Sequence, residues 1–148
     1  MNNIEHFETL TKYIGKFDTA DSLGEWIIDT KNDGTLENPR HMSWVNYTDL
    51  VIAFKREFYQ FSKDNPEYEL SQYSTILQAN GLKWSKNEIR SIEADKLDAK
   101  CILALIMGAV RADRFSEGAL LGFLKDGNIS NWLKRLKDID KKAPSNCQ

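Results

Sequence analysis

Two arginines and two carboxylates follow the most apolar stretch of the chain within one short run, Val110-Arg-Ala-Asp-Arg-Phe-Ser-Glu-Gly118. On a helix, residues three or four apart lie on one face, so Arg111 faces Arg114 and Arg114 faces Glu117. Asp113 lies four residues before Glu117, which brings four charged side chains within two helical turns. Charges beside a run of core character need partners, or they lie in a functional cleft.

Two kinds of chemistry fit this charged cluster. In the first, the side chains pair with one another and hold a corner between two helices. Arg114 is then largely buried against carboxylates or helix-end carbonyls, and Arg114→Ala costs about 3–5 kcal/mol. In the second, Arg111 and Arg114 bind a phosphate or carboxylate, and Glu117 orients them. The ion-pair network is favoured, and the alternative is an anion or ligand cluster of Arg111, Asp113, Arg114 and Glu117.

Four aromatic residues are candidates for lining a pocket: Trp26, Trp44, Tyr47 and Trp84. They fall at the ends of predicted elements and not on regular helical faces. Aromatic side chains at such positions line ligand pockets or interfaces, or they close the core where helices are short. Closing the core is the favoured interpretation.

Searches for metal, cofactor and catalytic motifs yield no site. His6 and His41 have no cysteine or carboxylate at metal-ligand spacing. The segment from Asp29 to Gly34 resembles the start of a calcium loop, but a lysine stands at the third ligand position. No Lys-Ser or Lys-Thr pair follows Gly118-x-x-x-Gly122, so that run is not a phosphate-binding loop. We expect no metal and no cofactor, the catalytic residues stay unknown, and a non-enzymatic role is favoured over an enzyme.

Length and composition predict one soluble domain. The 148 residues suffice for one core, and we assign residues 1–142 to a single helical domain and 143–148 to a flexible tail. The net charge is −2, with an acidic half before residue 81 and a basic half after it. No stretch approaches the roughly 18 apolar residues of a membrane span. The start of the chain lacks a secretory signal and the two cysteines form no disulfide framework, so we expect a cytoplasmic protein.

The spacing of apolar residues predicts an all-α domain of about six to eight helices joined by short turns. Capping and turn residues set the predicted boundaries. The predicted helices are one through Phe7, Leu10, Ile14 and Phe17, a short one from Asp21 or Ser22 through Trp26, one from Asn46, with Asp49 in its first turn, to Asn65, one over 71–80, one from the capping box Ser85-x-x-Glu88, one over 97–111, one over 116–125 and one over 129–139. The residues Asp29 to Arg40 are predicted as a loop, with a tight hairpin at Asp33-Gly34.

Three sets of residues together resemble a family of small bacterial proteins known only as a domain of unknown function. They are Gly34…Pro39…Trp44-Val45…Phe54…Tyr59, then Val110-Arg-Ala-Asp-Arg-Phe-x-Glu-Gly118, then Gly127-x-Ile129-x-x-x-Leu133-x-Arg135-Leu136. The resemblance spans the chain from about residue 24. It implies a bacterial or phage protein of the cytoplasm, and it adds weight to the charged cluster without supplying an activity.

Three functions remain open at this point. The favoured one is a small regulatory or interaction module with a protein partner, in which aromatic faces on residues 7–17 and 47–61 support a homodimer. The second is a small-ligand or anion-binding protein, or an enzyme, that uses the charged cluster beside Trp26 and Trp84. The third and least favoured is nucleic-acid binding through the basic C-terminal half, where Asp138 and Asp140 interrupt the lysines.

Overall fold

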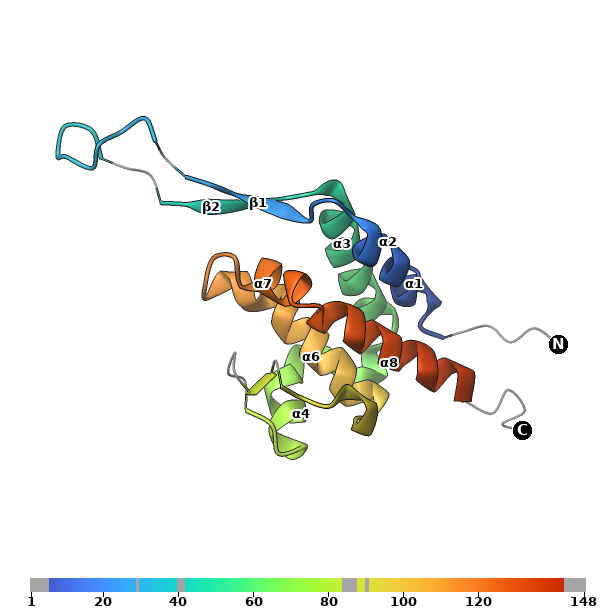
Figure 1. Ribbon diagram of the computed structural model, residues 1–148. Helices are drawn as coiled ribbons and strands as arrows, with labels where there is room; N and C mark the ends of the chain where they lie inside the picture. The colour runs from blue at the N-terminus through green and yellow to red at the C-terminus, as the bar shows by residue number, and fades with distance from the viewer. Residues whose placement is uncertain (1–5, 29, 40–41, 84–87, 90, 143–148) are drawn as a thin grey trace.

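The computed structural model describes residues 6–28, 30–39, 42–83, 88–89 and 91–142. The described part is mainly helical, as predicted, but it also contains one small antiparallel sheet of two strands. The fold is therefore not purely all-α. Figure 1 shows a body of packed helices from which this pair of strands extends to one side.

The longest apolar helix, α6 (Ala99–Arg111), forms the centre of the body. Its start is fixed by the Asp98 side chain, which accepts a hydrogen bond from the Cys101 amide at 2.9 Å. Every residue from Cys101 to Val110 is buried, so this helix is enclosed on all sides. It packs against α4 (Tyr73–Ala79), α7 (Ala119–Lys125) and α8 (Asn128–Lys142).

A second group of helices completes the core with an aromatic cluster. Helix α3 (Asp49–Asp64) buries Val51, Phe54, Phe58 and Phe61 along one face. Against it lie two short helices, α1 (Glu8–Thr11) and α2 (Tyr13–Thr19), where the sequence predicted one continuous helix. The rings of Tyr13 and Phe17 each lie 5.2 Å from the Phe54 ring, nearly perpendicular to it.

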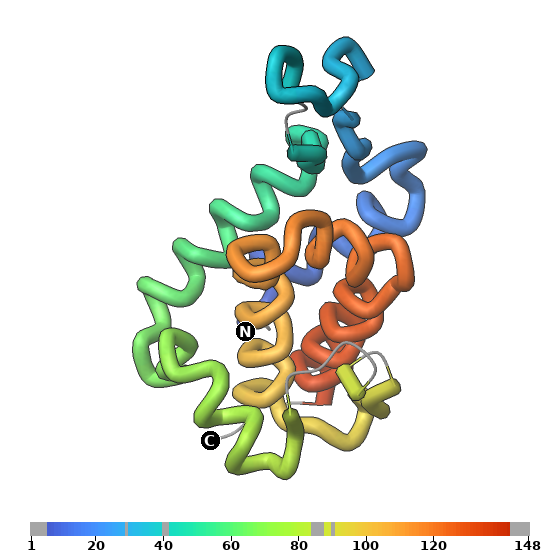
Figure 2. Tube along the Cα trace, turned by 90° about the vertical axis from the view of Figure 1, so that its left-hand side faces the viewer, coloured from blue at the N-terminus to red at the C-terminus, as the bar shows by residue number. Residues whose placement is uncertain are grey.

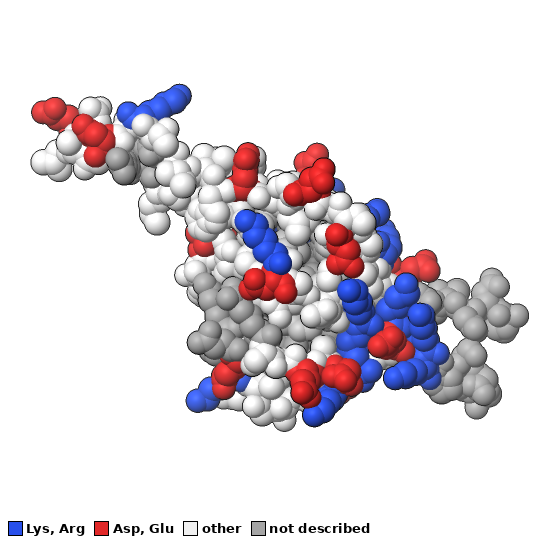
Figure 3. All heavy atoms as spheres, viewed as in Figure 1, with Lys and Arg blue, Asp and Glu red and all other residues white. Residues whose placement is uncertain are grey.

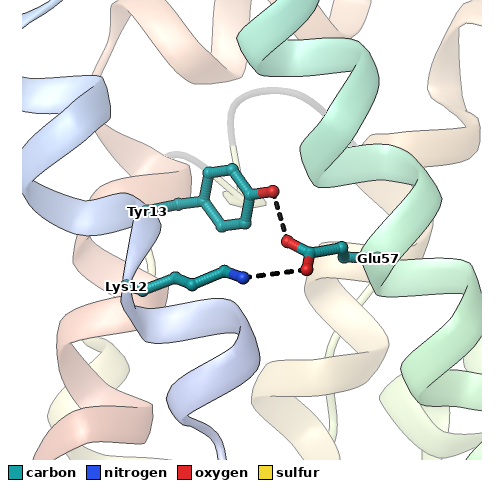
Figure 4. Close-up of polar contacts among 3 residues, drawn as sticks. All are labelled: Lys12, Tyr13 and Glu57. Carbon is teal, nitrogen blue, oxygen red and sulfur yellow. Dashed lines mark hydrogen bonds and ion pairs between the residues drawn. The ribbon is translucent and has the colours of Figure 1, made fainter.

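One polar contact joins α2 to α3 at the rim of this aromatic cluster (Figure 4). The Tyr13 hydroxyl donates to the Glu57 carboxylate, and Lys12 Nζ lies 2.8 Å from the second carboxylate oxygen. Burial is the main cause that raises the pKa of Tyr13 to about 12, and the Glu57 carboxylate adds to the effect. Burial alone would raise the pKa of Glu57, but the hydrogen bonds from Lys12 and Tyr13 outweigh it and lower that pKa.

The two strands correct two predictions, because the helix predicted from Asn46 begins only at Asp49 and the short helix through Trp26 is absent from the described residues. Residues 24–26 were predicted to end a short helix, but they belong to strand β1 (Gly24–Ile27), which pairs antiparallel with β2 (Trp44–Tyr47). In this pairing Gly24 is opposite Tyr47 and Trp26 is opposite Val45. A side chain on Gly24 would lie 3.2 Å from the Asn46 carbonyl oxygen, so glycine permits the close pairing. The strand forms because a partner segment about twenty residues later supplies its hydrogen bonds, which helix periodicity does not reveal.

The connection between the strands is long. The predicted tight hairpin at Asp33-Gly34 does not join them, because β1 ends at Ile27 and β2 begins at Trp44. Gly34 has a φ of 89° and its amide donates to the Asn38 carbonyl, so it makes a local turn inside the connection. We call the described residues 24–28, 30–39 and 42–47 the hairpin arm. Figure 2 shows the arm standing above the helices, which we call the helical body.

The remaining boundaries follow the predictions closely. Helix α4 lies within the predicted 71–80, and α7 and α8 lie at the predicted 116–125 and 129–139 with ends shifted by a few residues. The capping residue Ser85 lies outside the described residues, as does the 143–148 tail.

Candidate functional site

The turn between α6 and α7 holds the base of the hairpin arm. Asp113 lies in the 3₁₀ turn Ala112–Arg114 that follows α6. One of its carboxylate oxygens accepts the Tyr47 hydroxyl at 2.6 Å, and the other accepts the Leu120 amide at 3.0 Å. The Tyr47 oxygen in turn accepts the Leu121 amide at 3.1 Å. These bonds tie the last residue of β2 to the first turn of α7.

Burial and the nearby carboxylates set the protonation of Tyr47. Burial is the main cause that raises the pKa of Tyr47 far above its ordinary value, and the hydrogen bond and charge of Asp113 add to it. The phenol therefore stays protonated at neutral pH and donates to Asp113. This geometry makes Tyr47 a fixed structural link and not a proton-transfer group.

Glu117 makes the second connection between the turn and the arm. Its carboxylate accepts a hydrogen bond from the Val45 amide at 2.9 Å. Because that amide points to a side chain and not to β1, Val45 occupies a position in the pairing where main-chain groups face outward. Glu117 thus covers the edge of β2 that faces the body.

Gly118 completes the connection, because the absence of a side chain there leaves room for the Trp26 ring. Gly118 has a φ of 84°, and a Cβ atom there would lie 2.2 Å from Cζ2 of Trp26. The Trp26 ring consequently rests on the backbone of the turn, at a position that tolerates no side chain. The backbone conformation and the close contact both require glycine.

The two arginines of the charged cluster do not pair with its carboxylates. The prediction that Arg114 is buried is wrong: the side chain is exposed, and it makes no ion pair within the part of the chain that the structure describes. The reason is that Asp113 and Glu117 turn toward the arm. The α-helix also gives way to a 3₁₀ turn at residue 112, so the predicted helical face does not continue.

Arg111 is placed differently from Arg114. Its guanidinium carbon lies 5.6 Å from the centre of the Tyr73 ring, on α4. Its Nε atom is buried and has no hydrogen-bond partner in the described structure. Both arginines are therefore free of the carboxylates that were expected to hold them.

The three candidate aromatic residues that the structure describes do not converge on one pocket. Trp26 and Trp44 are both about half exposed, at 45% and 48%. Trp26 pairs with Val45 whereas Trp44 pairs with Ile27, and since neighbouring residues of a strand alternate, the two tryptophans project from opposite faces of the hairpin. Tyr47 is bound to Asp113, and Trp84 lies outside the described residues. No pocket formed by all four is described.

Most of the exposed large apolar side chains that the structure describes lie on the hairpin arm and on the turn beneath it. Within the described residues, six of the seven lie on the hairpin arm or on the turn beneath it: Trp26, Ile28, Leu36, Met42, Trp44 and Phe115. The seventh, Ile52, lies on α3. Met42 is 89% exposed and Phe115 is 81% exposed. Exposed apolar side chains thus occur on both faces of the arm, since Trp26 and Trp44 project from opposite faces.

The basic residues of the C-terminal helix α8 lie elsewhere on the molecule. In Figure 3, lysine and arginine side chains gather near the C-terminal end of α8, with acidic residues among them. In that helix the Arg135 Nε donates to the Leu97 carbonyl at 2.9 Å, and Lys134 lies 3.5 Å from Asp18. Nucleic-acid binding at this end of the chain stays a prediction.

The metal-ligating and nucleophilic side chains among the described residues give no further site. Among the described residues, no three of His, Cys, Asp and Glu come together as ligands for a metal ion. Cys101 is buried, and burial raises the pKa of its thiol to about 11, which keeps it protonated and unreactive at neutral pH. No helix in the described ranges has the length and apolar character to span a membrane.

A family model described as a family of unknown function (DUF6508) matches residues 2–142. The chain belongs to this family. The resemblance to a domain of unknown function is thereby confirmed, and the match extends over nearly the whole chain. Neither a curated protein nor a solved structure matches it.

Proposed function

We propose that this member of DUF6508 is a small interaction module that binds a protein partner through its hairpin arm. The observation that carries the proposal is the gathering of six exposed large apolar side chains on the arm and the adjoining turn. Aromatic residues and methionine are enriched at the centres of protein interfaces, and Trp26, Met42 and Trp44 are of these types. Trp44 and Met42 supply the apolar anchors.

The contacts at the base of the arm support the same function. Asp113, Glu117 and Gly118 fix Tyr47, Val45 and Trp26 in turn. A binding surface that is held in place before it meets its partner loses less entropy on binding. Asp113 and Glu117 thus act as positioning residues that hold the arm against the turn.

We also propose a bacterial cytoplasm as the place of action. The buried free thiol of Cys101 supports a reducing compartment, because the residue serves as a small apolar group inside α6. A regulatory role follows if the partner is itself an enzyme or a DNA-binding protein whose activity the arm changes.

Capture of the partner from a lysate of the native host tests the arm as the contact surface. The tagged wild-type chain is compared with the double variant Met42→Ser/Trp44→Ser and with Ile52→Ser, a matched control that removes exposed apolar surface from α3. We expect wild type and Ile52→Ser to retain the same protein and the double variant to lose it. Equal retention by all three would overturn the proposal.

Anion binding by Arg111 and Arg114 is the second candidate function. It is favoured by one observation: neither guanidinium has an ion-pair partner among the described residues. A thermal shift with inorganic phosphate measures it, since a ligand that binds only the folded chain raises the melting temperature. A shift in the wild type that Arg111→Gln abolishes would support the anion site, whereas equal shifts in both proteins would remove it.

A further inference from the structure

The pairing of β1 and β2 defines which main-chain groups of the arm remain available. The Val45 amide is bound by Glu117, and the Thr48 amide donates to the Leu23 carbonyl at 3.1 Å. Hydrogen-bonded pairs alternate along an antiparallel ladder, so the pairs 23–48, 25–46 and 27–44 carry the bonds. The main-chain groups of Gly24, Trp26 and Ile28 therefore point away from β2.

The two edges of this small sheet differ. The edge of β2 faces the helical body, where Glu117 covers it. Gly24, at the start of β1, also lines a groove with Leu124 and Gly127 of the helical body. Strand β1 forms the opposite edge of the sheet. Along it, the Gly24 carbonyl accepts the Ser22 hydroxyl at 3.3 Å, but the Trp26 amide and carbonyl have no partner among the described residues. An uncovered strand edge is a template for a further strand.

We propose that a second copy of this chain pairs with β1, antiparallel and across a twofold axis at Trp26, to form a four-stranded sheet. The proposal rests on the proposed function, because it uses the same arm, and it adds a second copy of the chain to what the arm binds. In this register Trp26 exchanges both main-chain hydrogen bonds with the partner's Trp26. Gly24 does the same with the partner's Ile28. Every outward group of the described edge then has a bond.

The side chains and charges favour a second copy as the occupant. Cross-strand neighbours in this register are Trp26 with the partner's Trp26, and Glu25 with the partner's Ile27, so no like charges lie directly opposite each other. The two Glu25 residues are diagonal neighbours whose backbones lie about 7–8 Å apart, and their carboxylates stay hydrated on the exposed face. The pairing also brings Ile28 of each copy, 63% exposed here, beside the other strand. The residues that would pair along the edge of β1 would thus also make the apolar contacts between the two copies.

Sedimentation equilibrium over a micromolar concentration series tests this pairing. The wild-type mass is expected to rise with concentration from 17.0 kDa toward twice that value. Ile28→Pro removes an outward amide while leaving the β1–β2 bonds in place, so it is expected to stay at 17.0 kDa. Ile28→Thr keeps the amide and a β-branched side chain, and it is expected to retain the dimer. Circular dichroism establishes that both variants are folded.

Glu25→Gln provides a second measurement that does not depend on proline. It removes the diagonal repulsion, and we expect dimerisation to strengthen by about 1.5- to 5-fold. A wild type of constant 17.0 kDa, or a dimer that Ile28→Pro leaves unchanged, would overturn the pairing. Such a failure is separate from that of the proposed function, because a monomer that still retains a protein partner through Met42 and Trp44 keeps the interaction module.

Discussion

In the helical body the large apolar side chains are enclosed, whereas in the hairpin arm they face solvent. Phe54, Phe58 and Trp132 are each at most 1% exposed, and α6 is buried over its whole apolar length. The arm and its supporting turn carry Met42, Trp44 and Phe115 in the open. The body uses apolar burial for stability. The arm holds comparable side chains outside that core, where the proposed contact with another molecule would bury them.

The largest expected effect comes from replacing a phenylalanine by alanine in each of the two regions and comparing the loss of stability. Phe58→Ala leaves a cavity in the body and is expected to lower the free energy of unfolding by about 3–5 kcal/mol. Phe115→Ala removes an exposed ring, and we expect a change within about 0.5 kcal/mol. Chemical denaturation at low protein concentration measures both. A large loss for Phe115→Ala would place that ring in the core and break the comparison.

The hydrogen bonds between the helical body and the hairpin arm are expected to contribute an intermediate amount to the free energy of unfolding. Asp113→Ala leaves the Leu120 amide and the Tyr47 hydroxyl without their acceptor, which costs about 1–3 kcal/mol. Asp138→Ala, on the outer face of α8, is the matched control and should leave the unfolding midpoint unchanged. If both variants unfold at the wild-type midpoint, Asp113 does not hold the arm.

Alkaline pH tests a tyrosine–carboxylate pair within the body. Tyr13 has its pKa raised from 10.0 to about 12 in the folded chain, mainly by burial and then by Glu57. The unfolded chain loses this proton first, so the stability is complete below pH 10 and falls as the pH rises toward about 12. Tyr13→Phe should therefore lose less stability than wild type between pH 9 and pH 11.5. Chemical denaturation at the two pH values measures this difference. If wild type and Tyr13→Phe lose the same free energy of unfolding, the raised pKa of Tyr13 is contradicted.

The smallest effect on stability is expected at Arg114, which was predicted to be largely buried. Because Arg114 is exposed, Arg114→Ala should change the free energy of unfolding by no more than about 0.5 kcal/mol. Arg135→Ala, which leaves the Leu97 carbonyl without its donor, should cost about 1–3 kcal/mol. Thermal unfolding of the two variants compares them. A loss of several kcal/mol for Arg114→Ala would restore the buried ion-pair network.

The helices could be predicted because their signals are local. The apolar run after Asp98 and the face formed by Val51, Phe54, Phe58 and Phe61 lie within single segments. Strand β1 could not be predicted in this way, because Asp21 and Ser22 are also good helix caps and its partner is about twenty residues away. The aromatic and β-branched residues Trp44, Val45 and Tyr47 were the available sign of a strand.

The candidate site could be predicted only in part, because its contacts join residues that are far apart in the sequence. The importance of the turn after α6 was visible in its run of charges, but the direction of each side chain was not. Asp113 and Tyr47 are 66 positions apart, and Glu117 and Val45 are 72 apart. Spacing along one helix suggested arginine–carboxylate pairs, and tertiary packing replaced them with bonds to the arm.

Oxidative footprinting of two methionines tests most directly whether the arm is a covered surface in the cell. Met42 lies on the arm at 89% exposed, and Met107 lies inside α6 at 3%. Hydroxyl radicals oxidise accessible methionine to the sulfoxide, so the dilute purified chain should react at Met42 and not at Met107. In intact cells we expect Met42 to become protected while Met107 stays unreactive. Equal oxidation of Met42 in the cell and in dilute solution would contradict the arm as a binding surface.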